Sequence, residues 1–206
     1  FPAALALRGL DAAGARVRMR ATLDAALALL DGSAGSQALE PRPGQSPVPG
    51  CMAADDETSL RWAAERGWGL VAAATHTRDR VQRALEIYTR AANGRTPALT
   101  LARFGCSADT RQDALAVAQP YFASLVARAD AAGWGRDRSR SIARDAQELV
   151  DESLIGSHAE VARAFQALGA SFGATHVAVV PTSGQFDAHK HILAAFVDEV
   201  RPLFDE

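Results

Sequence analysis

Polar side chains that could contact a ligand follow three apolar runs of this sequence. His76 comes shortly after the second run, and a Thr-Ser-Gly sequence at 182–184 follows the last. The carboxyl ends of parallel strands meet at one edge of a sheet, and ligands of α/β proteins bind there. We therefore expect the segments 53–59, 73–77 and 181–186 to form the ligand side of the protein, with His76 lining a substrate site.

The first of these segments is acidic, and it has two interpretations. Asp55, Asp56 and Glu57 precede a helical pattern, so their charges can complement the positive end of a helix. Alternatively, the backbone N–H groups of this helix start, together with Thr58 and Ser59, face a ligand. The residues alone leave both interpretations open.

Common catalytic motifs are absent from the sequence. It has no P-loop, no G-x-G-x-x-G, no G-x-S-x-G, no C-x-x-C and no H-E-x-x-H. His189 and His191 are two residues apart, which does not place both on one helix face, so no metal site is predicted. His158, beside an expected helix cap, is predicted to be solvated. Cys51 and Cys106 are interpreted as buried free thiols in a reducing compartment, which indicates a cytoplasmic protein.

The composition is that of a globular protein without a strongly charged partner. Of the 206 residues 48% are hydrophobic, and the formal net charge is −2. This charge gives no reason to expect nucleic acid or anionic lipid as a partner. No apolar run approaches the ~20 residues of a membrane helix. The sequence begins at Phe1 without an initiator methionine, so we expect a piece of a longer chain.

Periodicity predicts strands that alternate with helices. Strands are expected at 50–54, 69–74, 97–105 and 176–180. Helices are expected at 10–31, 56–66, 77–92, 110–132, 157–172 and 187–200, with a proline-rich connection at 40–49 and a polar, arginine-rich helix or loop at 136–150. The alternation predicts βαβ units and an α/β fold with a parallel sheet, as in a doubly wound sheet or a TIM barrel.

Several short stretches, in this order, resemble the luciferase-like flavin monooxygenase family. They are 41–49 (P-x-P-x-Q-x-P-x-P), 53–58 with 63–67 (A-[AS]-S-P-E-T … A-A-x-x-G), 103–110 with Ala114 (R-x-x-V-A-[DE]-T-x-x-E-A), 155–161 ([IV]-G-[ST]-P-E-x-V) and 196–202 (F-x-x-E-V-x-P). The resemblance covers essentially the whole chain.

The resemblance implies a (β/α)8 TIM-barrel fold in which the four expected strands are the fifth to the eighth. Residues 1–206 would form a single domain, the C-terminal half of the barrel. A leading helix and the proline-rich connection would occupy 1–46, and βα units five to eight would occupy 47–206. The first four strands, the catalytic histidine and most contacts to the isoalloxazine ring would then lie upstream of Phe1. The catalytic residues of this chain are therefore unknown.

A cofactor site at the end of the first expected strand is also implied by the resemblance. The family places its A-[AS]-S sequence against the flavin and the following helix start near the phosphate. The cofactor-binding residues implied here are Ala53, Ala54, Asp55, Thr58, Ser59 and, at the end of the next strand, Ala74. Asp55 departs from the family, which has a small hydroxyl residue there. A carboxylate this close to a phosphate costs ~1 kcal/mol or more.

Two classes of function follow. The resemblance implies an enzyme that uses reduced FMN and O2 to oxygenate a small organic substrate, or one that uses the deazaflavin F420 for hydride transfer. The other class is a truncated, non-catalytic protein that binds flavin or another chain. Four βα units leave open sheet edges, so a homo-oligomer or a missing N-terminal half is expected to complete the core.

Overall fold

The computed structural model describes residues 7–9, 11–34, 44, 49–54, 56–131 and 145–204. The chain divides into two compact units, Phe1–Gly50 and Cys51–Glu206. Asp55, most of the proline-rich stretch and most of the arginine-rich segment lie outside the described residues. The single domain expected from the sequence stays a prediction.

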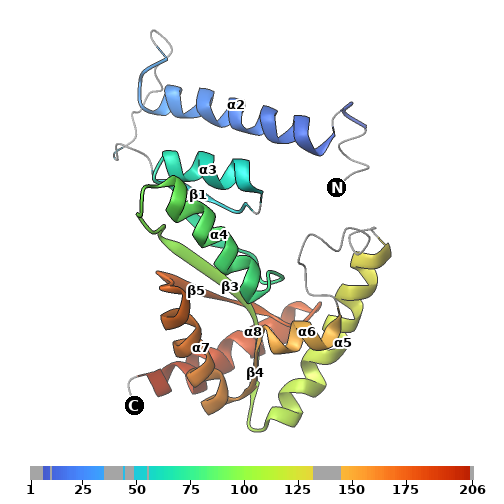
Figure 1. Cartoon of the computed structure of the whole chain (residues 1–206). Helices are drawn as coiled ribbons and strands as arrows, with labels where there is room; N and C mark the ends of the chain where they lie inside the picture. Colours follow the sequence, from blue (N-terminus) through green and yellow to red (C-terminus); the bar gives the residue numbers. More distant parts are fainter. Residues whose placement is uncertain are drawn as a thin grey trace. The chain divides into compact units, whose positions relative to one another are not determined.

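The first unit has helix α2 (Ala12–Leu30) among its described residues (Figure 1). Asp11 begins this helix, because its carboxylate accepts the backbone N–H of Gly14 at 2.6 Å. After the helix Gly32 has a φ of 78°, a left-handed conformation that glycine adopts without strain. The helix predicted at 10–31 is confirmed.

The second unit alternates strands with helices (Figure 1). Its strands are β1 (Cys51–Met52), β2 (Gly69–Ala72), β3 (Leu99–Ala108), β4 (Leu154–Ser157) and β5 (His176–Pro181). Its helices are α3 (Glu57–Glu65), α4 (Arg78–Ala91), α5 (Arg111–Ala131), α6 (Ala146–Asp151), α7 (His158–Phe172) and α8 (Phe186–Ala195), followed by the π-helical turn η3 (Phe196–Val200) and the 3-10 turn η4 (Arg201–Phe204). The four predicted strands are confirmed, and β4 is an additional one.

Every strand pairing is parallel, as predicted, and β3 is the central strand. β1 pairs with β2, and β2 pairs with residues 99–101 of β3. β5 pairs with residues 100–105 of β3 and β4 with residues 105–108. Residues 100–101 therefore have β2 and β5 as neighbours, and Gly105 has β4 and β5. It follows that β5 occupies one edge of β3, whereas β2 and β4 share the other.

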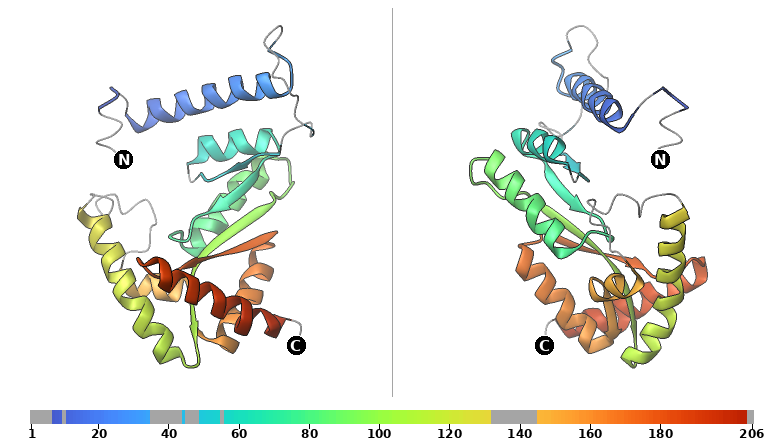
Figure 2. Two further views of the ribbon diagram at one scale, coloured as in Figure 1. Left: turned by 180° about the vertical axis from the view of Figure 1, so that it is seen from behind. Right: turned by 45° about the vertical axis from the view of Figure 1, so that its right-hand side comes forward.

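The connections before and after β4 lie on opposite faces of the sheet. α5 and α6 lead from β3 to β4, and α7 leads from β4 past β3 to β5. The first crossover runs across the sheet from β3 to β4, and the second runs back in the opposite direction, from β4 to β5. Because parallel crossovers are right-handed, two crossovers that run in opposite directions place their helices on opposite faces of the sheet. In Figures 1 and 2, α5 and α7 accordingly flank β3 on opposite sides.

Alternation along β3 separates two buried clusters. Phe104 packs with Phe122 of α5, the ring centroids being 5.4 Å apart. On the other face Val179 of β5 packs in the cluster that contains α7. A Cβ atom at Gly105 would lie 2.5 Å from Cγ1 of Val179, so odd positions of β3 face this second cluster. Arg103 therefore points toward the α7 side.

Two expectations about burial are wrong. Cys51 is exposed, because it lies in the edge strand β1, whereas Cys106 in the central strand is buried as predicted. His158 has only 21% of its side chain exposed. It is the first residue of α7 and directly follows the buried strand β4, a strand that the sequence pattern did not predict.

Candidate functional site

The end of β1 carries the first group of predicted cofactor residues. Ala53 is exposed and Ala54 is half-buried, so small side chains line this end of the strand. Asp56 caps α3, since its carboxylate accepts the backbone N–H of Ser59 at 3.0 Å. Ser59 is buried and Thr58 is exposed. The helix-cap interpretation thus holds for Asp56, and the flavin-binding role of the four other residues remains a prediction.

Ala74 lies beyond the end of β2 and is buried in the cluster that contains Phe104 and Cys106. On the same face Thr182, which directly follows β5, is almost fully buried at 1% exposure. Burial raises the pKa of the Cys106 thiol, and the neighbouring Thr182 hydroxyl opposes the shift. The ends of β2 and β5 therefore meet at one apolar patch, with Cys106 in its protonated form at neutral pH.

His76 follows in the turn between β2 and α4. Its backbone N–H donates to the carbonyl oxygen of Ala73 at 2.9 Å, which fixes the turn. Its side chain is half-buried, and burial, with a smaller contribution from the positive charge of Arg103, lowers its pKa. The imidazole is therefore neutral at neutral pH, a form that can accept a proton or a hydrogen bond.

Arg103 lies on β3, and its side chain is fully buried at 0% exposure. Its Nη1 donates to the carbonyl oxygen of Ala102 at 2.8 Å, and Nε and Nη2 have no hydrogen-bond partner among the described residues. Burial lowers the pKa of Arg103 to about 10, an effect that Glu152 opposes and Arg78 reinforces. The guanidinium is therefore charged at neutral pH. Sequence reasoning did not single it out, although a lone charged residue inside the apolar strand 99–106 was a signal.

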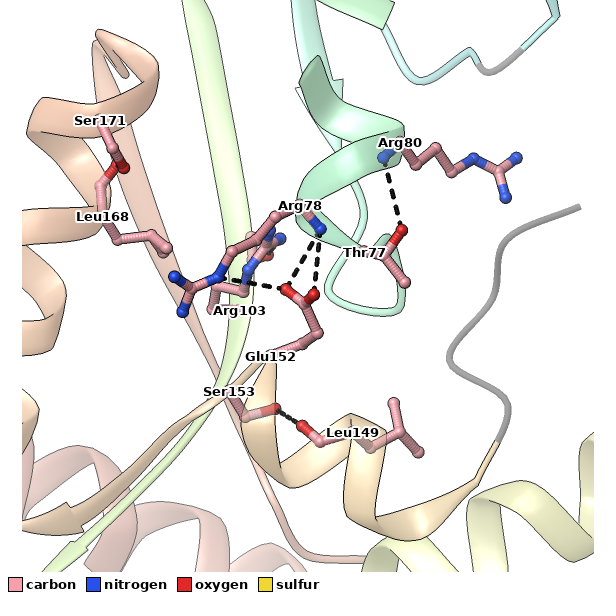
Figure 3. Close-up of polar contacts among 10 residues, drawn as sticks. Thr77, Arg78, Arg80, Arg103, Leu149, Glu152, Ser153, Leu168 and Ser171 are labelled. Atoms are coloured by element: carbon pink, nitrogen blue, oxygen red, sulfur yellow. Dashed lines mark hydrogen bonds and ion pairs between the residues drawn. The ribbon is translucent and has the colours of Figure 1, made fainter. Parts of the chain in front are cut away.

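Glu152, between α6 and β4, reaches the N-terminus of α4. Both of its carboxylate oxygens accept the backbone N–H of Arg78 at 3.2 Å, and Oε2 is 3.5 Å from Nε of the same residue. Figure 3 shows Arg103 beside this pair. His76, Arg78, Arg103 and Glu152 form one electrostatic group at the carboxyl end of β2, which we call the β2-end cluster.

His158 and Ser157 occupy the end of β4. Ser157 and Glu160 form a capping box for α7, which confirms the cap expected there. The Nε2 atom of His158 is 3.5 Å from the exposed carboxylate of Asp109, at the end of β3. These residues hold β4 against β3 and α7.

The described residues contain no cluster of three or more histidine, cysteine or acidic side chains arranged to hold a metal. Within the same residues no helix is long and apolar enough to cross a membrane.

The family model described as luciferase-like monooxygenase matches residues 2–176. The chain therefore belongs to the luciferase-like monooxygenase family, and its α/β fold is that of this TIM-barrel family. A search of curated proteins found no match.

Solved structures with similar folds include three oxidoreductases of known cofactor or reaction class. The monooxygenase RslO1 from Streptomyces bottropensis has a TM-score of 0.70 at 20% identity, over 98% of this chain and 66% of its own. The oxygenating constituent of 3,6-diketocamphane monooxygenase from Pseudomonas putida, in complex with FMN, has a TM-score of 0.55 at 23% identity, over 74% of this chain and 47% of its own. The coenzyme F420-dependent tetrahydromethanopterin reductase from Methanopyrus kandleri has a TM-score of 0.52 at 21% identity, over 82% of this chain and 55% of its own. At these identities the likeness shows the fold alone, and the chain spans about half to two thirds of the length of these structures.

Proposed function

We propose that this chain is part of a flavin-dependent oxidoreductase that uses reduced FMN and O2 to oxygenate a small organic substrate. The observation that supports this proposal most directly is the match of the luciferase-like monooxygenase model to residues 2–176. An F420-dependent hydride transfer is the alternative, which the similar fold of an F420-dependent reductase favours. A non-catalytic flavin-binding or interaction protein is a third possibility.

The residues at the end of β1 fit the ring of a flavin. Ala53 is exposed and Ala54 half-buried, so a planar ring can approach the backbone without displacing a large side chain. When bound, the flavin would supply the redox chemistry. The neutral His76 would contribute a hydrogen-bonding group at the same edge of the sheet, and the apolar patch at Ala74 would exclude water from it.

The N-terminus of α3 fits the flavin phosphate poorly. The backbone N–H of Ser59 already donates to the Asp56 carboxylate, and Glu57 adds a second acid in the first turn. A phosphate there would meet two negative charges, at a cost of ~1 kcal/mol or more for each close pair. The proposal therefore assigns the ring to the end of β1 and leaves the phosphate to another group of donors.

We further propose that the protein is cytoplasmic and that it associates with itself or with a further segment of the same protein. The two cysteines are free, which suits a reducing compartment. A homo-oligomer, or a further segment of the same protein, would cover the open edge of β1.

Flavin titration tests the function. Purified protein is titrated with FMN and with F420, and binding is followed by absorbance and fluorescence. Ala53→Trp is expected to weaken binding about tenfold, or ~1.4 kcal/mol, by blocking the ring. Ala167→Trp, on the exposed surface of α7, is the matched control and should leave binding unchanged. Failure of the wild-type protein to bind either cofactor would refute the proposal.

A further inference from the structure

The N-terminus of α4 already holds a carboxylate from a distant part of the chain. α4 has 14 residues, and Thr77 caps it by accepting the backbone N–H of Arg80 at 3.4 Å. The N–H of Arg78 is donated to Glu152, which lies 74 residues further along the chain. A helix N-terminus attracts anions through its unpaired N–H groups and its dipole. Glu152 is thus an oxyanion bound at this helix end.

Next to this helix end lies a buried cation whose hydrogen-bonding capacity is largely unused. Arg103 is 0% exposed, and two of its three guanidinium nitrogens, Nε and Nη2, have no partner among the described residues. The guanidinium lies within electrostatic range of both Glu152 and Arg78, because both charges act on it. A buried hydrogen-bond donor without a partner lowers the stability of the folded state, and a charged donor lowers it more. Glu152 attracts this group without hydrogen bonding to it.

The charges within the β2-end cluster do not balance. Arg78 and Arg103 bring two positive charges, the end of α4 adds a partial one, and Glu152 supplies one negative charge. Outside the cluster, the first turn of α4 also carries Asp79 and Arg80, whose charges are opposite. His76 faces the group as a neutral ring. From α7, Leu168 and Ser171 lie on this side (Figure 3), and neither is charged. The β2-end cluster is therefore positive overall and has unused donors.

We propose that the N-terminus of α4 and Arg103 form a binding site for the oxyanion group of a ligand, a phosphate or a carboxylate, and that Glu152 holds the site until the ligand displaces it. The Glu152 side chain is 18% exposed, so it can turn toward solvent. An incoming oxyanion would accept the N–H of Arg78 and hydrogen bonds from Nε and Nη2 of Arg103 together. The parallel donors of a guanidinium match two oxygens of such a group.

Inorganic phosphate tests the site without any flavin. Thermal denaturation and calorimetric titration are carried out in phosphate and in chloride at equal ionic strength. Phosphate is expected to stabilise the wild-type protein, because a ligand that binds the folded state raises its melting temperature. Glu152→Gln removes the competing carboxylate and should tighten phosphate binding by about tenfold. Arg103→Gln should abolish binding.

The control is the exposed ion pair Glu57–Arg61 on α3. Glu57→Gln removes the same charge and should leave phosphate affinity unchanged. If Arg103→Gln does not fold, the phosphate affinities of the wild type and of Glu152→Gln still test the site. Equal phosphate affinity in these two proteins, or unchanged affinity in folded Arg103→Gln, would overturn the site.

Competition identifies the source of the oxyanion. Displacement of phosphate by FMN but not by riboflavin would assign the site to the cofactor phosphate. Displacement by neither would assign it to an anionic substrate. Both results keep the oxyanion site, and phosphate binding can succeed or fail independently of flavin binding.

Discussion

A Cβ atom placed on Gly105 of β3 would lie 2.5 Å from Cγ1 of Val179 on β5. The two strands pair in parallel, and this contact depends on their register. Gly105→Ala is therefore expected to lower the free energy of unfolding by about 1–3 kcal/mol, as overpacking does. Adding Val179→Ala should recover part of that loss, which urea denaturation of the two single variants and the double variant would measure.

Gly169 on α7 is the matched control for this prediction. Its Cβ would meet only Cγ2 of Val177, at an ordinary contact distance of 3.7 Å. Gly169→Ala should stabilise the protein, by up to ~1 kcal/mol, because alanine favours the helix interior. Loss of stability of the same size in both alanine variants would contradict the β3–β5 register.

The pH dependence of stability reports on His76. Its pKa in the folded state is lowered, so below about pH 6.5 the unfolded state binds more protons than the folded state. The contribution of His76 is fully present above that pH, and it is lost as the pH falls toward the folded pKa. His76→Gln should weaken this decline in denaturation curves recorded from neutral to mildly acidic pH.

The positive charge of Arg103 contributes to the lowered pKa of His76. NMR titration should show a higher His76 pKa in Arg103→Gln than in the wild type, because one positive charge is gone. The pKa should stay below the ordinary value, since burial is the larger cause of the shift. An unchanged His76 pKa in a folded variant would mean that the two side chains do not interact.

Replacing the buried charge by an apolar side chain should stabilise the protein. Arg103→Met is expected to raise the free energy of unfolding by about 1 kcal/mol or more, because a buried charge with unused donors is removed. Leu101→Ala, on the same face of β3, is expected to lower it by about 2–5 kcal/mol. Similar losses in both variants, measured by urea denaturation, would show that the guanidinium is fully paired.

The capping box of α7 gives a further prediction. The hydroxyl oxygen of Ser157 accepts the backbone N–H of Glu160 at 3.4 Å, and Oε2 of Glu160 accepts the N–H of Ser157 at 2.8 Å. Ser157→Ala should cost about 1 kcal/mol of stability, and Ser157→Thr should restore most of it. The N–H of Ser157 and its hydroxyl, which also donates to Oε2 of Glu160 at 3.1 Å, lower the pKa of Glu160. Its contribution is therefore lost as the pH falls through that folded value.

The sequence predicted the alternation of strands and helices well, because each element has a strong local pattern. β3 and β5 read as apolar runs, and α7 carries both a capping box and helical spacing. β4 was missed because its four residues have no pattern of their own. They are held in place by pairing with Gly105 to Ala108, which depends on contacts distant in sequence.

The candidate site was predicted in part. The position of His76 follows from the end of the strand before it, which periodicity indicates. The pairing of Glu152 with Arg78 crosses 74 residues and has no local signal. The exposure of Cys51 depends on its position at the sheet edge, which strand order alone decides. Local chemistry thus indicates which segments end at the ligand side, and packing determines which charges meet there.

The return of β4 to the strand from which the chain departed has a consequence for insertions. The connection between them leaves β3 after Ala108 and enters β4 at Leu154, which pairs with Gly105 of the same strand β3. Lengthening this connection alters no strand order and costs only about 0.6 kcal/mol for each doubling of its length. An insertion between β3 and β4 is therefore expected to leave the pairing of β3 with β4 and β5 unchanged.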